Sequence, residues 1–203
     1  MTGAPVTGAA GRRGRPRSAA AGTAIVEAVL RLIEEGESID GLSVERIART
    51  AGVGKATVYR RWAGKDALLL EVMRTLDEPA VVPRGDSVRE DLVAILERLR
   101  RRGLAKRESA LLRAMMSHFR SHPRLWQAYH DTVIRARRET LHAVLRRGMT
   151  RGELRDDIDV ELLGELFTGP MLSRALLHEG CELPEGLAER IVDAVLEGAR
   201  ARG

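Results

Sequence analysis

The stretch SVERIARTAGVGKATVYRRW, residues 43–62, decides the fold of this chain. It predicts two short helices joined by a tight turn, because Ser43 has the side chain of a helix N-cap and apolar residues follow it at helical spacing. Gly52 can take a positive φ without steric cost, so the first helix is expected to end there. Val58 and Trp62 mark the inward face of the second helix. Two helices joined by a short turn that contains Gly form the helix-turn-helix, whose second helix enters the major groove of DNA.

The second helix also carries polar groups that suit DNA. Lys55 stands in its first turn, where the helix dipole already presents partial positive charge. That position is poor for stability but favourable when a phosphate or a guanine edge arrives. A helical hairpin with a solvated charged face would show the same pattern, and this alternative stays open. The residues expected to contact DNA here are Ser43, Lys55, Ala56, Thr57, Tyr59, Arg60, Arg61 and Lys65.

With TVY at residues 57–59 and KDAL at residues 65–68, the chain resembles the DNA-binding domain of the TetR (tetracycline-repressor) family. The resemblance is specific over residues 20–73 and continues more weakly through RGELRDDIDVELL and GPMLSRALLHEG. Gly54 departs from the family pattern, in which Ser is common. The resemblance implies phosphate contacts at Ser43, Tyr59 and Lys65, a homodimer on a DNA operator, and an effector pocket in the C-terminal part.

Composition fits a DNA-binding protein of the cytoplasm. Residues 1–66 hold 11 basic and 7 acidic side chains, whereas the remainder holds 23 and 22, so the positive excess is N-terminal. Aromatic residues make up 3% of the chain, so the core must be aliphatic. No apolar run is long enough to span a membrane, and no secretory signal is evident. The single cysteine, Cys181, forbids an internal disulfide and fits a reducing compartment. We expect a cytoplasmic, nucleoid-associated protein without a membrane partner.

Residues 1–18 are predicted to be a disordered basic arm. Four arginines, Arg12, Arg13, Arg15 and Arg17, surround a Gly-Arg-Pro that resembles the centre of an AT-hook, an extended segment that enters the minor groove. The alternative is a loose tail that adds only sequence-independent attraction to phosphates. Arg15 and Arg17 are the candidate contacts of this arm.

The remaining pattern is helical, and the predicted fold is all-α with about nine helices. A three-helix DNA-binding domain is expected over residues 19–66 and a helical ligand-binding and dimerisation domain over residues 67–203. Pro170 is expected to kink its helix, because proline removes one bond of the helical ladder. The expected helices span residues 19–35, 44–51, 55–62, 65–76, 87–102, 108–120, 123–148, 159–179 and 185–201.

The last two helices are expected to form the dimer interface, because each carries more apolar surface than one flank of a subunit can cover. The candidate interface residues are Phe167, Met171, Ala175, Ile191 and Val195. The family resemblance places a pocket for an unknown, largely apolar effector among the preceding helices. Ordinary core packing would explain the same residues, namely Met115, Met116, Phe119, Trp126, Tyr129 and His130.

The sequence gives only weak signals for metal binding or catalysis. His118 and His122 are four residues apart, as two metal ligands on one helical face would be, but the Glu of a zinc protease is missing between them. No catalytic residue, metal or cofactor is expected. The sequence predicts a ligand-responsive transcriptional regulator, most simply a repressor that binds a near-palindromic operator as a dimer. The alternatives are a DNA-binding regulator without a small-molecule ligand and a helical enzyme with an accessory helix-turn-helix.

Overall fold

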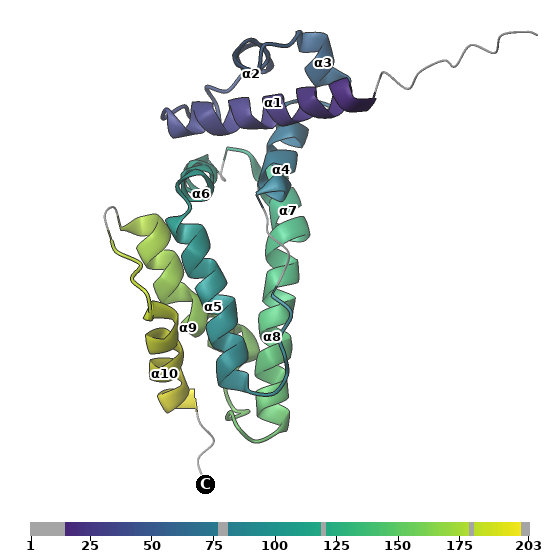
Figure 1. Cartoon of the computed structure of the whole chain (residues 1–203). Helices are drawn as coiled ribbons and strands as arrows, with labels where there is room; N and C mark the ends of the chain where they lie inside the picture. Colours follow the sequence, from purple (N-terminus) through teal and green to yellow (C-terminus); the bar gives the residue numbers. More distant parts are fainter. Residues whose placement is uncertain (1–14, 77–80, 119–120, 179–180, 200–203) are drawn as a thin grey trace, which may run out of the picture.

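The computed structural model describes residues 15–76, 81–118, 121–178 and 181–199, and within these ranges every regular element is a helix (Figure 1). The N-terminal helices stand at one end of the molecule, and α4 leads from them into the C-terminal half. This part contains α1 (Arg15–Glu34), α2 (Val44–Thr50), α3 (Lys55–Tyr59) and α4 (Lys65–Thr75). The C-terminal half contains α5 (Val88–Leu104), α6 (Lys106–His118), α7 (Pro123–Tyr129), α8 (Arg135–Thr150), α9 (Val160–Leu172) and α10 (Leu187–Ala199).

Two π-helical segments continue regular helices. The segment η1 (His130–Ile134) joins α7 to α8, and η2 (Ser173–Leu177) extends α9. When each continuous rod is taken as one, the described residues form nine helices, which confirms the predicted all-α fold. Pro170 lies inside α9, and the regular ladder gives way to η2 three residues later. The kink predicted at this proline stays a prediction.

Helix α1 begins at Arg15, four residues before the predicted start. Pro16 permits this because the N–H groups of a first helical turn have no acceptor within the helix. The prediction of a disordered or extended segment is therefore wrong for residues 15–18, and Arg15 and Arg17 belong to a helical turn. The rest of the predicted arm, residues 1–14 with Arg12 and Arg13, lies outside the described residues.

Two hydrophobic clusters hold the fold together. The first contains the apolar faces of α1 to α4 and also Leu111, Met115 and Tyr129, so α6 and α7 share a core with the N-terminal helices. The second joins α5, α8, α9 and α10 around Phe167. The first cluster matters for function because it links the helix-turn-helix physically to helices of the C-terminal half. No helix in the described ranges is both long and apolar enough to cross a membrane.

Candidate nucleic-acid interface

The turn between α2 and α3 has the geometry that the sequence predicts. Ser43 caps α2, since its Oγ accepts a hydrogen bond from the backbone N–H of Arg46 at 3.1 Å. Gly52 has a φ of 68°, a conformation that favours glycine. The backbone N–H of Val53 then donates to the Ala48 carbonyl at 2.9 Å, which satisfies a carbonyl at the end of α2. These bonds fix the direction in which α3 leaves the turn.

Helix α3 separates a buried side from an exposed side. Val58 is fully buried in the first hydrophobic cluster, and Trp62 packs against the same cluster. The regular helix ends at Tyr59, earlier than predicted, although the Trp62 N–H still bonds to the Val58 carbonyl at 3.0 Å. The outward side is formed by Lys55, Ala56, Tyr59, Arg60 and Arg61, which are exposed, and Thr57, which is half-buried. Tyr59 is 58% exposed, which is unusual for a large aromatic side chain.

Lys55 is paired with an acidic residue that the sequence reasoning missed. Its Nζ lies 2.7 Å from Oε1 of Glu45 on α2, and both side chains are more than half exposed. The hydrogen bond from Lys55, together with its charge, lowers the pKa of Glu45. The helix-turn-helix spacing could have suggested the pair, because residue 45 lies in the first turn of α2 and residue 55 in the first turn of α3. In the absence of DNA, the first cation of α3 is therefore held by a carboxylate.

Arg61 lies against α1. Its guanidinium sits 5.5 Å from the centre of the Trp62 ring, a cation–π arrangement. A Cβ at Gly22 would lie only 2.8 Å from Nη1 of Arg61, so this glycine makes room for the guanidinium on α1. Sequence reasoning placed Arg61 on the DNA side without this contact, because the position of α1 depends on tertiary packing. Its role as a DNA contact stays a prediction.

The loop between α1 and α2 connects the interface to the rest of the molecule. Lys65, at the start of α4, donates from Nζ to the Ile39 carbonyl at 2.9 Å. The next residue, Asp40, lies with Oδ1 2.6 Å from Nε2 of His122, just before α7. Lys65 therefore braces this loop, whatever contact it makes with DNA, and His122 ties the loop to the C-terminal half.

The metal site considered from the sequence would need two histidines on one helical face. Helix α6 ends at His118 and α7 begins at Pro123, so His118 and His122 do not share one helical face. Within the described ranges, no group of three potential ligands from His, Cys, Asp and Glu is close enough to hold a metal ion.

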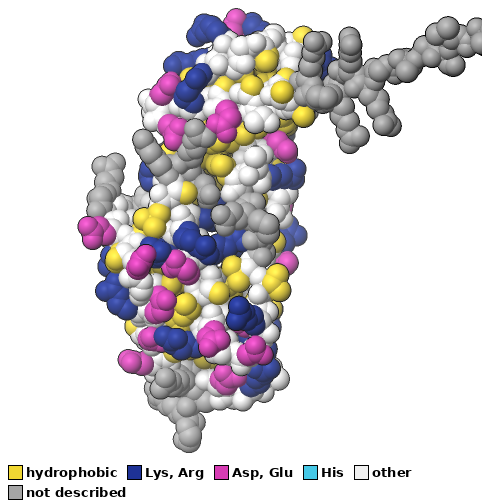
Figure 2. All heavy atoms as spheres, viewed as in Figure 1, with side chains coloured by type: hydrophobic (Ala, Val, Ile, Leu, Met, Phe, Trp, Pro, Cys, Tyr) yellow, Lys and Arg dark blue, Asp and Glu magenta, His cyan; other side chains and the backbone are white. Residues whose placement is uncertain are grey.

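The exposed end of the molecule carries the charge that the interface would use. Lys and Arg side chains lie over α1 to α3, with Asp and Glu side chains among them (Figure 2). Arg31 of α1 forms a hydrogen bond within the N-terminal helices. Its Nη2 donates to the Thr50 carbonyl at 3.1 Å and so joins α1 to the end of α2. The basic surface is therefore mixed in sign, and Glu45 is its acidic member closest to Lys55.

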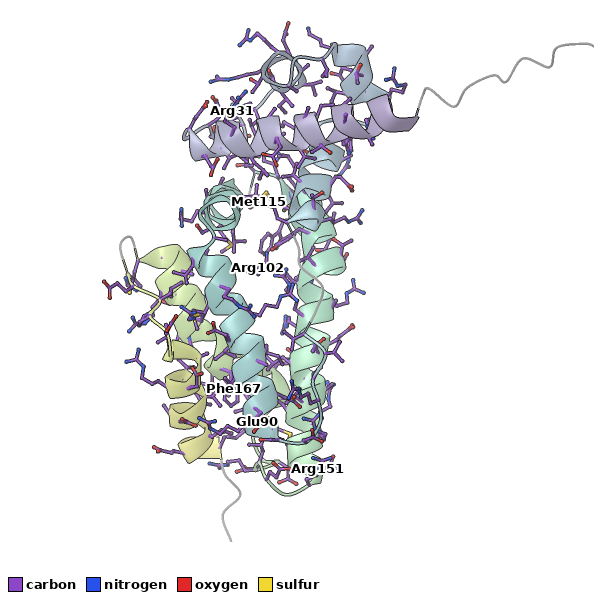
Figure 3. All side chains as sticks on the ribbon, viewed as in Figure 1. Arg31, Glu90, Arg102, Met115, Arg151 and Phe167 are labelled. Carbon is purple, nitrogen blue, oxygen red and sulfur yellow. The ribbon has the colours of Figure 1, made fainter. Side chains whose placement is uncertain are left out.

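The predicted effector pocket is nearly filled. Met115 and Tyr129 are 2% and 4% exposed, and Met115 lies between α6 and α4 (Figure 3). The Trp126 and Tyr129 rings are 6.0 Å apart, and the cavity beside Met115 and Tyr129 measures only about 10 Å³. Met116 is at the surface, and His130 is partly exposed. Phe119 lies outside the described residues. Met115, Trp126 and Tyr129 therefore pack as ordinary core, and the role of the predicted residues in binding an effector stays a prediction.

The predicted dimer residues divide into two groups. Phe167, which lies among the helices of the C-terminal half (Figure 3), is fully buried within the subunit. Met171 is also fully buried and Ile191 is 8% exposed, so the prediction is corrected for these three. The sequence showed apolar residues on several sides of these helices but could not show which side faces α5 and α8. Ala175 and Val195 are half-buried. The apolar side chains that α9 leaves at the surface are Leu162 and Leu166, which are 50% and 47% exposed.

Comparison with known proteins matches both halves of the chain. Residues 25–72 match the family described as bacterial regulatory proteins, tetR family, and residues 82–195 match the tetracyclin repressor-like C-terminal domain. The chain is 30% identical to the uncharacterized HTH-type transcriptional regulator YdeS of Bacillus subtilis, over 94% of this chain and 95% of YdeS.

Two solved structures show the same fold. NalD of Pseudomonas aeruginosa, described as the secondary repressor of the MexAB-OprM multidrug efflux pump, has a TM-score of 0.71 and is 20% identical; the match covers 90% of this chain and 98% of NalD. FadR of Bacillus subtilis in complex with stearoyl-CoA has a TM-score of 0.68 and is 15% identical, with 88% and 99% covered.

Proposed function

This chain belongs to the TetR family of bacterial transcriptional regulators, and from that premise we propose that it is a ligand-responsive repressor which binds a near-palindromic operator as a homodimer. The observation that carries the proposal is the two-sided helix α3. Val58 anchors one side of this helix in the core, while Lys55, Tyr59 and Arg60 stand exposed on the other. A short helix presented in this way after a glycine turn suits the major groove.

The proposed contacts fall into two kinds. Lys55 and Thr57 lie near the start of α3, where the side chains of a recognition helix reach base edges. Ser43, Tyr59 and Lys65 would bind phosphates and so position α3 without reading sequence. Ala56, Arg60 and Arg61 would complete the contact surface. Arg15 and Arg17, in the first turn of α1, would add contacts, and residues 1–14 would add affinity.

The proposed response to a ligand uses the shared core. Because α6 and α7 pack against α1 and α4, a ligand that shifts α6 or α7 would also shift the helix-turn-helix. Two subunits must hold their reading helices about 34–36 Å apart to fit successive half-sites, so a small change of angle would release the operator. The stearoyl-CoA complex of FadR and the repressor description of NalD support this scheme by analogy. A regulator of chromosomal operators would work in the cytoplasm, at the nucleoid.

The two-domain division follows from the same scheme. We propose that residues 19–66, together with the turn of α1 that precedes them, form the DNA-binding domain and that residues 67–203 form the ligand-binding and dimerisation domain. The dimer would form through the outward faces of α9 and α10, since Leu162 and Leu166 of α9 are exposed and Val195 of α10 is half-buried.

Selection of bound duplexes from a random DNA pool by the full chain tests the proposed function. The expected result is an enriched inverted repeat, with two chains per duplex by light scattering and half-sites about one helical turn or a multiple apart. Recovery of sequence-independent binding alone, with a slope against salt but no enriched motif, would remove the operator-specific function.

A further inference from the structure

A cavity far larger than the predicted pocket opens on the C-terminal half of the molecule. It measures about 660 Å³ and lies between the end of α5, α6, η2 and residues 181–184. Small-molecule sites typically measure about 300–1,000 Å³. None of its lining residues belongs to the small cavity beside Met115. The size therefore suits a ligand, and the position is distinct from the site that the sequence suggested.

The wall formed by residues 181–184 is built in place. Nη1 of Arg100 donates to the Leu183 carbonyl at 2.7 Å, and the same guanidinium is held by Glu97 through bonds of 2.7 and 2.8 Å. Arg100 is only 8% exposed. Gly103 allows this wall to close on α5, since a Cβ there would lie 2.6 Å from Cδ1 of Leu183. A wall fixed by buried hydrogen bonds loses little entropy when a ligand binds against it.

The lining combines apolar surface with an excess of positive charge. Leu104, Leu176 and Leu183 contribute apolar surface, whereas two guanidinium groups, of Arg113 and Arg174, stand against the single carboxylate of Glu182. Neither arginine forms an ion pair with any carboxylate in the part of the chain that the structure describes. The bonds of Arg174 are weak, because its Nη1 lies 3.5 Å from Sγ of Cys181 and 3.4 Å from the Glu182 carbonyl. These guanidinium groups are thus available to an anion beside an apolar surface.

The cavity also touches the helices that the proposed response requires. Helix α6, which carries Arg113, packs against both α1 and η2. The segment η2, which carries Arg174, is continuous with α9, one of the two proposed dimer helices. A ligand bridging Arg113 and Arg174 would therefore set the distance between the helix that supports α1 and the helix that faces the partner.

We propose that this cavity is an effector site for a small molecule with one anionic group and an apolar body, such as a medium-chain carboxylate. Arg113 and Arg174 hold the anionic group, and Leu104, Leu176 and Leu183 cover the apolar body. The assignment as an effector site, although not the binding itself, rests on the function proposed above.

Cys181 provides a direct test, because it lines the cavity and is the only cysteine of the chain. We would measure the rate at which N-ethylmaleimide, a neutral reagent, modifies Cys181 in the full-length protein. Decanoate should slow the reaction about fivefold at saturation, whereas acetate and decanol at the same concentration should not, since each supplies only half of the required chemistry.

Two substitutions and a control locate the effect. Arg113→Gln should raise the decanoate concentration that gives half-maximal protection of Cys181 about tenfold. Arg174→Gln should do the same, because each substitution removes one charge-assisted hydrogen bond to the ligand. Arg146→Gln, which removes an exposed guanidinium on α8, should leave it unchanged. Arg113→Gln is the more informative change, since Arg174 itself approaches the thiol.

Absence of protection by decanoate, or equal protection in all three variants, would overturn the proposed site. Operator binding is measured on the same samples without decanoate. If decanoate does not protect Cys181 in a protein that still binds the operator, the proposed site is wrong and the proposed function stands. Protection in a protein that binds no operator supports the site as a binding site and defeats the proposed function instead.

Discussion

Oε1 of Glu45 and Nζ of Lys55 lie 2.7 Å apart and join the two helices of the helix-turn-helix. A carboxylate at this point opposes DNA binding in two ways, because it repels phosphates and occupies the amine that would meet them. Exposed pairs of this kind contribute little to the free energy of unfolding. The pair therefore matters for the DNA affinity of the interface more than for the stability of the fold.

Glu45→Gln should strengthen operator binding, because it removes a negative charge and releases Lys55. We expect the operator affinity to rise about threefold at physiological salt. The slope of log affinity against log salt concentration should also steepen by up to about 1, which corresponds to one further released counterion. The melting temperature should stay the same. Fluorescence anisotropy with a labelled operator at several salt concentrations measures both quantities. If the gain persists in Glu45→Gln/Lys55→Ala, relative to Lys55→Ala, the carboxylate acts on phosphates directly and not through Lys55.

Lys55→Ala should weaken operator binding without lowering the melting temperature, since the Lys55 side chain is half exposed and its partner is solvated. A loss of about tenfold is expected if the amine meets a base edge or a phosphate. Arg146→Ala removes the same charge from the exposed surface of α8 and is the matched control. Equal affinities for the wild type and Lys55→Ala at physiological salt would place the reading contacts elsewhere.

Lys65→Ala should alter two properties at once. The bond from Nζ to the Ile39 carbonyl is lost, so the free energy of unfolding should fall by about 1 kcal/mol. If Lys65 also binds a phosphate, affinity should fall alike for operator and unrelated DNA, and the salt slope should decrease by about 1. Thermal melting and anisotropy separate the two effects. An unchanged salt slope would leave Lys65 with the bracing role alone.

Leu166→Asp should convert the proposed dimer into monomers, because it replaces an apolar side chain of α9 that is 47% exposed by a charged one. Light scattering at micromolar concentration measures the change, and operator affinity should fall with it. Glu165→Gln, at the neighbouring exposed position on the same helix, is the control for a general surface change. A Leu166→Asp protein that remains dimeric would assign the interface to another face.

The sequence was sufficient where local signals agreed with each other. The Ser43 cap, the positive φ at Gly52 and the buried Val58 all depend on neighbours within a few residues, so pattern and resemblance predicted them correctly. Helix positions followed the apolar period for the same reason. The start of α1 was misplaced because the composition before residue 19 indicated an arm, while helix geometry tolerates Pro16 in the first turn.

The sequence did not predict those features of the site in which contacts join residues that are far apart in the chain. Phe167 and Met171 looked available to a partner because α9 is apolar on more than one side, and only the packing of α5 and α10 shows which side is covered. The helix-turn-helix spacing places Glu45 and Lys55 in the first turns of neighbouring helices, but the 2.7 Å contact between them also depends on the angle between α2 and α3. The 660 Å³ cavity has no continuous sequence signal, since its lining comes from four separate segments.

The buried carboxylate of Asp91 supports the last prediction, which concerns stability. Asp91 is 3% exposed and accepts hydrogen bonds from the backbone N–H groups of Arg84 and Gly85 at 2.7 and 3.0 Å, and from Nη2 of Arg147 at 2.5 Å. It therefore joins the segment before α5 to α8. Burial alone would raise the pKa of Asp91, but these three donors together outweigh it and lower the pKa.

Asp91→Asn should reduce the free energy of unfolding by about 2 kcal/mol, because Arg147, whose side chain is 25% exposed, loses the charge that it pairs with in a partly buried site. Asp193→Asn is the matched control, since Asp193 pairs with Arg89 at the surface at 2.6 Å, and it should cost less than about 1 kcal/mol. The pH dependence has a definite sign. The folded pKa of Asp91 lies below its unfolded value of 3.8, so its stabilising contribution is complete above that value and is lost as the pH falls through the folded pKa. Urea unfolding should therefore show a constant difference between wild type and Asp91→Asn at neutral pH and a shrinking one below about pH 4. A difference independent of pH down to acid unfolding would mean that the carboxylate charge is not what stabilises this contact.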